Sequence, residues 1–124
     1  MPGLKKIRLL IVDDENDLRD LLSQILGSEG YEIVTACDGD EAIRILGEES
    51  FDAALLDILM PNRSGFEVLK HITKNHPATK SIMLTGYTDL KVAIEAKEKG
   101  AVEFISKPYK LETVLSTLQR VLSP

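Results

Sequence analysis

The chain has 124 residues, of which 44% are hydrophobic and 28% charged, a composition typical of one folded domain and not of a disordered chain. Its net charge of −5, without any basic run, argues against direct nucleic-acid binding, and no apolar segment approaches the length of a membrane span. Cys37 is the only cysteine, so an internal disulfide and a cysteine-built metal site are excluded, and we expect a small, buried or half-buried apolar residue there. We therefore expect a single cytoplasmic domain that occupies 1–124, with its core over about 7–122.

Strand and helix patterns alternate five times along the chain. Unbroken apolar runs predict strands that are buried on both faces, and apolar residues three and four positions apart predict helices. Strands are predicted, in order, at 9–12, 32–36, 53–57, 81–85 and 103–106. Helices are predicted from Asn16 to Gly27 or Gly30, from after an Asp38-Gly39 turn to Gly47, from about 66 to 75, from 88 or 89 to 99, and from 111 to 122. The helix that ends at 99 has the weakest apolar stripe, so we expect it to be the least firmly anchored.

This alternation predicts a parallel sheet with helices on both faces, joined by right-handed crossovers. In such sheets ligands bind outside the carboxyl ends of the strands. The residues that directly follow or end the predicted strands are therefore the first candidates for a functional site.

Polar side chains gather at these strand ends. Asp13 and Asp14 follow the first strand, Asp57 ends the third, Thr85 ends the fourth and Lys107 follows the fifth. Converging carboxylates repel one another, and after one pairs with the lysine the others suit a hard divalent cation such as Mg²⁺. An Asp carboxylate can also act as the nucleophile that forms an aspartyl phosphate, a reaction that depends on a metal, a cation and donors around the transferred group.

Each of these residues has a simpler interpretation in isolation. Asp13 and Asp14 would stabilise a helix N-terminus, Thr85 would end a strand, and Lys107 would be an exposed loop lysine. Phe104 on the last strand suits the core as well as it suits a functional role. The co-location of the polar residues favours function, since otherwise several independent explanations would have to coincide.

Five sequence fragments carry a resemblance to a known family. They are Ile11-Val12-Asp13-Asp14-Glu15, Leu55-Leu56-Asp57-Ile58-Leu59-Met60-Pro61 with Gly65, Thr85-Gly86, Gly100-Ala101 and Lys107-Pro108-Tyr109. In this order, over about 7–122, they resemble the receiver domain of two-component response regulators. Ser64 departs from the family, in which an acid is common before the loop glycine, and we expect this to affect loop capping more than chemistry.

The resemblance implies a flavodoxin-like, doubly wound (βα)5 fold with strand order 2-1-3-4-5. It implies that Asp57 accepts a phosphoryl group from a phosphohistidine of a sensor histidine kinase or a histidine phosphotransfer protein. Mg²⁺ would be bound by Asp14, Asp57 and the backbone carbonyl of Leu59, with Asp13 acting through water. Lys107 would pair with the phosphoryl group.

The family resemblance also implies a switch. Thr85 would hydrogen-bond to the phosphoryl group and Phe104 would turn inward, which alters the surface of the fourth helix, last strand and last helix for an output domain or partner protein. Gly86 leaves room for the phosphoryl group, and the bulky Leu59 and Tyr87 would slow its hydrolysis by obstructing water.

We expect a signalling module and not an enzyme that acts on a separate substrate. Three alternative functions fit parts of the sequence. A nucleotide or flavin binder would need a phosphate-binding loop where Asp13-Asp14-Glu15 stands. A Mg²⁺-dependent aspartyl-phosphate phosphatase usually has a second acid at the place of Leu59. A degenerate receiver, used only for unphosphorylated protein interaction, is the third alternative. The sequence leaves open a phosphorylation-dependent homodimer.

Overall fold

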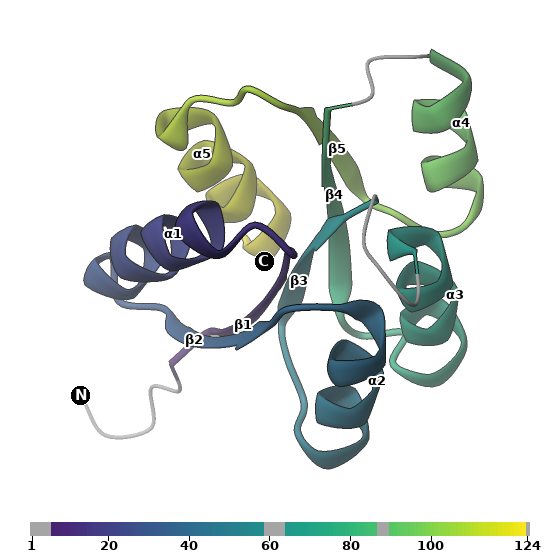
Figure 1. Cartoon of the computed structure of the whole chain (residues 1–124), viewed down its shortest axis with the longest axis horizontal. Coiled ribbons are helices and arrows are strands. Elements are labelled where there is room, and N and C mark those ends of the chain that lie inside the picture. The colour runs from purple at the N-terminus through teal and green to yellow at the C-terminus, as the bar shows by residue number, and fades with distance from the viewer. Residues whose placement is uncertain (1–5, 59–63, 87–89, 124) are drawn as a thin grey trace.

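Strands and helices alternate along the chain in a computed structural model, which describes residues 6–58, 64–86 and 90–123 (Figure 1). The strands are β1 (Arg8–Val12), β2 (Glu32–Ala36), β3 (Ala53–Asp57), β4 (Lys80–Thr85) and β5 (Glu103–Ser106). The helices are α1 (Asn16–Ser28), α2 (Gly39–Glu48), α3 (Gly65–Asn75), α4 (Leu90–Glu98) and α5 (Leu111–Leu122). No helix within these residues is long and apolar enough to span a bilayer.

The strands form one parallel sheet in the order β2-β1-β3-β4-β5, which confirms the predicted fold class and strand order. Val12 lies opposite Leu56, and Asp57 lies opposite Leu84. The carboxyl ends of the central strands are therefore level. Residues that follow β1 are brought beside the residue that ends β3.

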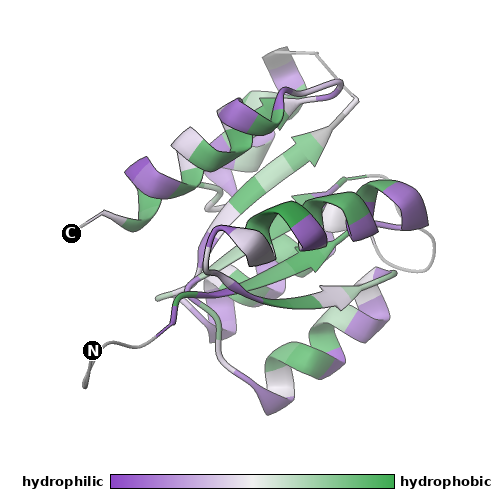
Figure 2. Cartoon of the chain, turned by 90° about the vertical axis from the view of Figure 1, so that its left-hand side faces the viewer, coloured by the Kyte–Doolittle hydropathy of each residue, from purple (hydrophilic) through white to green (hydrophobic). Residues whose placement is uncertain are grey.

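Two hydrophobic cores lie on opposite faces of this sheet. Along β1, Leu10 and Val12 pack into the core under α2, α3 and α4, while Leu9 and Ile11 pack into the core under α1 and α5. These four side chains are at most 1% exposed, as expected for a strand covered by helices on both sides. Figure 2 shows that the strands are mainly apolar and that the helices carry polar side chains on part of their surface.

Two predictions near the start of α2 were wrong. Asp38 and Gly39 do not form a turn: Asp38 caps the helix by accepting a hydrogen bond from Glu41 N at 2.8 Å, and Gly39 is its first residue. Cys37 is exposed instead of buried or half-buried. The cause is the position of Cys37 just past β2, an edge strand, where its thiol lies 3.6 Å from a carboxylate oxygen of Glu41.

Helix α4 is only lightly packed against the sheet. Of its described side chains, Ala96 is buried, whereas Ile94 is 48% exposed. The segment after α4 is tied to α3, because the Thr73 hydroxyl donates to the Lys99 carbonyl at 2.8 Å. The exposure of Ile94 agrees with the expectation that this helix is weakly anchored, while the Thr73 hydrogen bond holds the chain just past its end.

Candidate functional site

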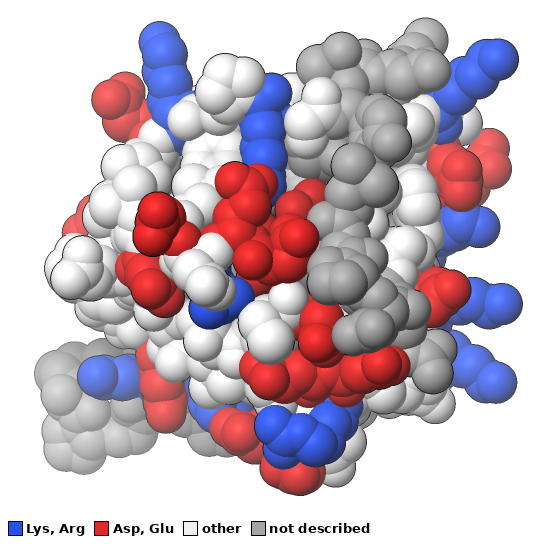
Figure 3. Space-filling model, in the orientation of Figure 1, with Lys and Arg blue, Asp and Glu red and all other residues white. Residues whose placement is uncertain are grey.

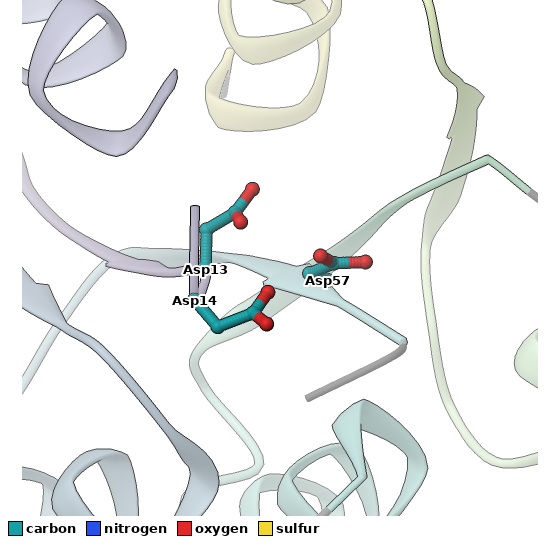
Figure 4. Close-up of side chains that lie close together, drawn as sticks. All are labelled: Asp13, Asp14 and Asp57. Atoms are coloured by element: carbon teal, nitrogen blue, oxygen red, sulfur yellow. The ribbon is translucent and has the colours of Figure 1, made fainter. Parts of the chain in front are cut away.

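Three carboxylates meet where β1 and β3 end. One oxygen each of Asp13, Asp14 and Asp57 can be chosen so that all three lie within 4.8 Å of one another. Asp13 and Asp57 are buried, at 1% and 5% exposure, while Asp14 is exposed. Figure 4 shows Asp13 and Asp14 as neighbours just past β1, with Asp57 beside them from β3. The fold thus brings together the acids that the sequence singled out.

The turn between β1 and α1 is fixed by hydrogen bonds around Asp13. Its backbone N–H donates to the Ala36 carbonyl at 3.2 Å, and its side-chain Oδ1 accepts from Glu15 N at 2.9 Å. Arg19 reaches back from α1 and donates through Nη1 to the Asp13 carbonyl at 2.9 Å. These contacts hold the paired aspartates in place before any ligand binds.

Lys107 supplies the positive charge of the site. It precedes Pro108 through a cis peptide bond, and its Nζ lies 3.0 Å from Asp13 Oδ2, 3.2 Å from Glu15 Oε1 and 3.3 Å from Asp57 Oδ2. Burial lowers the pKa of Lys107, but the hydrogen bond to Asp13 and the nearby carboxylate charges outweigh burial and raise it above its usual value. Lys107 is therefore firmly protonated at neutral pH.

Glu15 contacts Lys107, although the sequence does not predict this ion pair. From the sequence, Glu15 is part of an acidic motif, and the lysine is expected to neutralise one acid. One feature of the sequence could have predicted this contact. Glu15 is the third consecutive acid after β1, so its longer side chain lies on the same loop as Asp13 and Asp14. Its side chain is 62% exposed, in contrast to 2% for Asp13 and 7% for Asp57.

Gly65 packs directly against the backbone at the end of β3, where Asp57 lies. Its N–H donates to the Ile58 carbonyl at 2.9 Å, and a Cβ at this position would lie 2.0 Å from the Asp57 carbonyl oxygen. No side chain can be accommodated there without moving backbone. Ser64, the departure noted in the sequence, caps α3 by accepting a hydrogen bond from Glu67 N.

Tyr109 packs beside the lysine at the edge of the site. Its ring belongs to the apolar layer under α1 and α5, and its hydroxyl is buried without a hydrogen-bond partner among the described residues. Burial is the main cause that raises the pKa of Tyr109 to about 12. The phenol is therefore neutral at physiological pH.

Of the remaining predicted residues, the structure describes the backbone of Thr85, Gly86 and Phe104. Thr85 ends β4, opposite Ser106, and Gly86 follows it, but the Thr85 side chain lies outside what the structure describes. Leu59 and Tyr87 also fall outside the described residues. Phe104 on β5 is half-buried and packs against the core under α2, α3 and α4.

The donor set has the chemistry of a hard-cation site. Carboxylate oxygens are the ligands that Mg²⁺ prefers, and three aspartates cluster here, of which Asp13 and Asp57 pair with Lys107. Figure 3 shows acidic side chains gathered at the middle of the viewed face, with basic side chains mainly at its margins. A divalent cation at the aspartates would offset this excess of negative charge.

Comparisons with known proteins agree with this geometry. Residues 9–119 match the family model described as the response regulator receiver domain. The response regulator protein PilR of Pseudomonas aeruginosa is 36% identical over 124 residues, which cover 98% of this chain but only 28% of PilR.

Solved structures match over nearly the whole chain. A CheY-like response regulator receiver domain protein from Methanospirillum hungatei JF-1 has a TM-score of 0.92 and 36% identity, and the match covers 95% of this chain and 94% of that one. The response regulator TrrA of Thermotoga maritima, in complex with Mg²⁺ and BeF, has a TM-score of 0.85 and 35% identity, with 94% and 99% of the two chains covered.

Proposed function

Because the chain belongs to the response regulator receiver domain family, we propose that it acts as a single receiver unit over 1–124 and that Asp57 is its phosphoryl acceptor. The donor is a phosphohistidine of a sensor histidine kinase or of a histidine phosphotransfer protein. The observation that carries this proposal is the buried Asp57 carboxylate, which is clustered with two further aspartates and lies 3.3 Å from a protonated lysine.

The proposed transfer is a displacement at phosphorus. An Asp57 carboxylate oxygen forms a bond to phosphorus while the bond between phosphorus and the donor imidazole nitrogen breaks. The electron pair of the broken bond stays on that nitrogen, which is then protonated by solvent. Lys107 stabilises the added negative charge, and the Thr85 hydroxyl is proposed to donate a hydrogen bond to a phosphoryl oxygen.

Mg²⁺ is the proposed cofactor, and the carboxylate cluster fits it. Asp14 and Asp57 would bind the ion directly together with the Leu59 backbone carbonyl, and Asp13 would act through water. When bound, the ion supplies charge neutralisation at the phosphoryl oxygens. Arg19 and Glu15 N keep Asp13 in position for this role.

The proposed output surface comprises α4, β5 and α5. Glu103 on β5 joins the helices on either side, since it lies 3.8 Å from Lys97 of α4 and 3.2 Å from Arg120 of α5. Phe104 lies next to this link and, in the proposed switch, turns inward after phosphorylation. The surface would then present a changed shape to an output domain or partner protein, or to a second copy in a phosphorylation-dependent homodimer.

The experiment that tests the proposal uses acetyl phosphate as a small phosphoryl donor. Wild type, Asp57→Ala and the surface control Asp17→Asn are incubated with Mg²⁺ and donor, with and without a chelator, and their intact masses are measured. We expect the mass of one phosphoryl group to be gained by wild type and Asp17→Asn only, and only with Mg²⁺ present. No gain in wild type, or an equal gain in Asp57→Ala, would overturn the proposal.

A further inference from the structure

The three acceptors around Lys107 differ in how easily they can give up the lysine. An ammonium group has three N–H donors, and each has a carboxylate acceptor within 3.0 to 3.3 Å, on Asp13, Glu15 and Asp57. Every donor of Lys107 is therefore committed in the unphosphorylated protein. A new acceptor can be reached only if one of the existing contacts is released.

Asp13 is poorly suited to release the lysine. Its side chain is 2% exposed, and its other oxygen is already fixed by Glu15 N at 2.9 Å. Loss of the lysine would leave a buried carboxylate without its cation, which is costly. Asp57 carries the group being modified, so its contact with the lysine changes with the reaction itself.

Glu15 is the acceptor that can release Lys107 at low cost. Its side chain is 62% exposed, so water can replace the ammonium group at its oxygen. An ion pair with one exposed partner contributes little to stability. The contact is nevertheless positioned to compete directly with any new acceptor bound to Asp57, because both draw on the same nitrogen.

We propose that Glu15 is a positioning residue that holds one donor of Lys107 in the unphosphorylated protein and yields it to the phosphoryl group. This inference rests on the proposed phosphorylation of Asp57 and assigns Glu15 a regulatory part in it. Glu15 opposes entry into the phosphorylated state, so its removal favours that state. The expected size is about two- to fivefold, as for an exposed ion pair.

Two substitutions separate the contact from the charge. Glu15→Gln keeps the length of the side chain and an acceptor oxygen but removes the charge, which weakens the hydrogen bond to the ammonium group. Glu15→Asp keeps the charge but shortens the side chain by about 1.5 Å, so that it no longer reaches the lysine. Asp17→Asn removes an exposed charge two residues away from Glu15. Each variant is compared with wild type in the presence of saturating Mg²⁺.

Two measurements report whether an N–H donor of Lys107 is available to the phosphoryl group, and neither depends on the stability of the fold. The first is the rate at which acetyl phosphate modifies Asp57, in which the carboxylate oxygen bonds to phosphorus and acetate leaves with the electron pair. The second is the affinity for beryllofluoride, a phosphoryl mimic, followed by NMR. Both Glu15 variants should exceed wild type about two- to fivefold in rate and affinity, with Asp17→Asn unchanged and the thermal midpoints of all variants alike.

The inference would be overturned if Glu15→Asp behaved as wild type, or if Asp17→Asn accelerated as much as Glu15→Gln, since charge alone would then explain the effect. These outcomes leave the proposed function intact, because wild type is still phosphorylated. Failure of wild type to be phosphorylated at all would reject the proposed function as well.

Discussion

Replacement of Gly65 by alanine should destabilise the protein strongly, because the new methyl group has no space. Its Cβ would lie 2.0 Å from the Asp57 carbonyl oxygen, 2.8 Å from the Asp57 carbonyl carbon and 2.9 Å from Ile58 Cα. All three are backbone atoms, so no rotamer change can relieve the overlap. Either the start of α3 or the end of β3 must move by more than about 1 Å to restore ordinary contact distances.

The expected cost combines two terms. Overpacking costs about 1 to 3 kcal/mol, and the backbone contacts place this case at the upper end. The hydrogen bond from Gly65 N to the Ile58 carbonyl contributes about 1 kcal/mol more when it is stretched. We expect a loss of about 3 kcal/mol or more, which lowers the thermal midpoint of a domain of this size by roughly 10 °C.

Gly47 provides the matched control, because it lies inside α2 and a Cβ there would meet no atom within 4 Å. Gly47→Ala should leave stability unchanged or raise it by up to about 1 kcal/mol, through helix propensity alone. Thermal unfolding followed by circular dichroism measures both variants, and Mg²⁺ titration of Gly65→Ala should show weaker binding. A Gly65→Ala protein that melts at the wild-type temperature would refute the close-approach argument.

The contacts of the site lead to four further predictions. Tyr109→Phe should be neutral or stabilising by about 1 kcal/mol in urea unfolding at neutral pH, since it removes a buried hydroxyl that lacks a partner among the described residues; a clear loss of stability would show that this hydroxyl is satisfied. Because burial raises the pKa of Tyr109 to about 12, wild type should lose stability as the pH rises from about 10 to 12, where the unfolded chain releases the phenolic proton first, and Tyr109→Phe should lose less. Lys107→Met should lower the free energy of unfolding by about 2 to 3 kcal/mol without Mg²⁺, because Asp13 and Asp57 lose their shared cation. Mg²⁺ should restore part of this stability. Equal destabilisation with and without Mg²⁺ would contradict the charge argument. Ser64→Ala should cost about 1 kcal/mol while Ser64→Asp retains wild-type stability, and similar melting of both variants would show that the cap of α3 contributes nothing.

The strands could be predicted closely because their signal is local. A strand that is buried on both faces must be apolar throughout, and this condition marks 53–57 in the sequence as it does in β3. Two strands begin one residue before their apolar runs, β1 at Arg8 and β4 at Lys80, whereas the sequence predicts starts at 9 and 81. Lys80 pairs with Ala53 through the backbone, and such pairing depends on the neighbouring strand and not on the side chain of Lys80.

The wrong prediction for Cys37 has the opposite cause. Free cysteine is commonly buried in proteins, which is why burial was expected. The apolar pattern does not show which strand is at the edge of the sheet or which way the chain turns after it. The resemblance supplied the strand order, yet the residue just past β2 depends on the helix cap at Asp38, which directs the backbone into α2. The pattern Asp38-Gly39-Asp40-Glu41, an N-cap residue followed three positions later by Glu, was the signal that would have corrected both the turn and the cysteine.

The acids and the lysine of the site could be predicted because parallel strands carry their carboxyl ends to one edge, whatever the details of the loops. Asp13, Asp14, Asp57 and Lys107 follow from that rule, and the structure brings them together. This rule predicts that the residues are close together, but it does not predict which acids accept hydrogen bonds from Lys107. Whether Lys107 pairs with one acid or with three depends on where the turn after β1 places the side chains of Asp13 and Glu15.

The number of acids that pair with Lys107 determines whether phosphorylation must break an existing contact. A lysine paired with one acid would have donors to spare for a phosphoryl group, and phosphorylation would need no rearrangement of its contacts. A lysine held by Asp13, Glu15 and Asp57 has none to spare, so the unphosphorylated state has a defined network that must be partly broken. The exposed Glu15 makes that break inexpensive, and the buried Asp13 ensures that the lysine stays at the site while it happens.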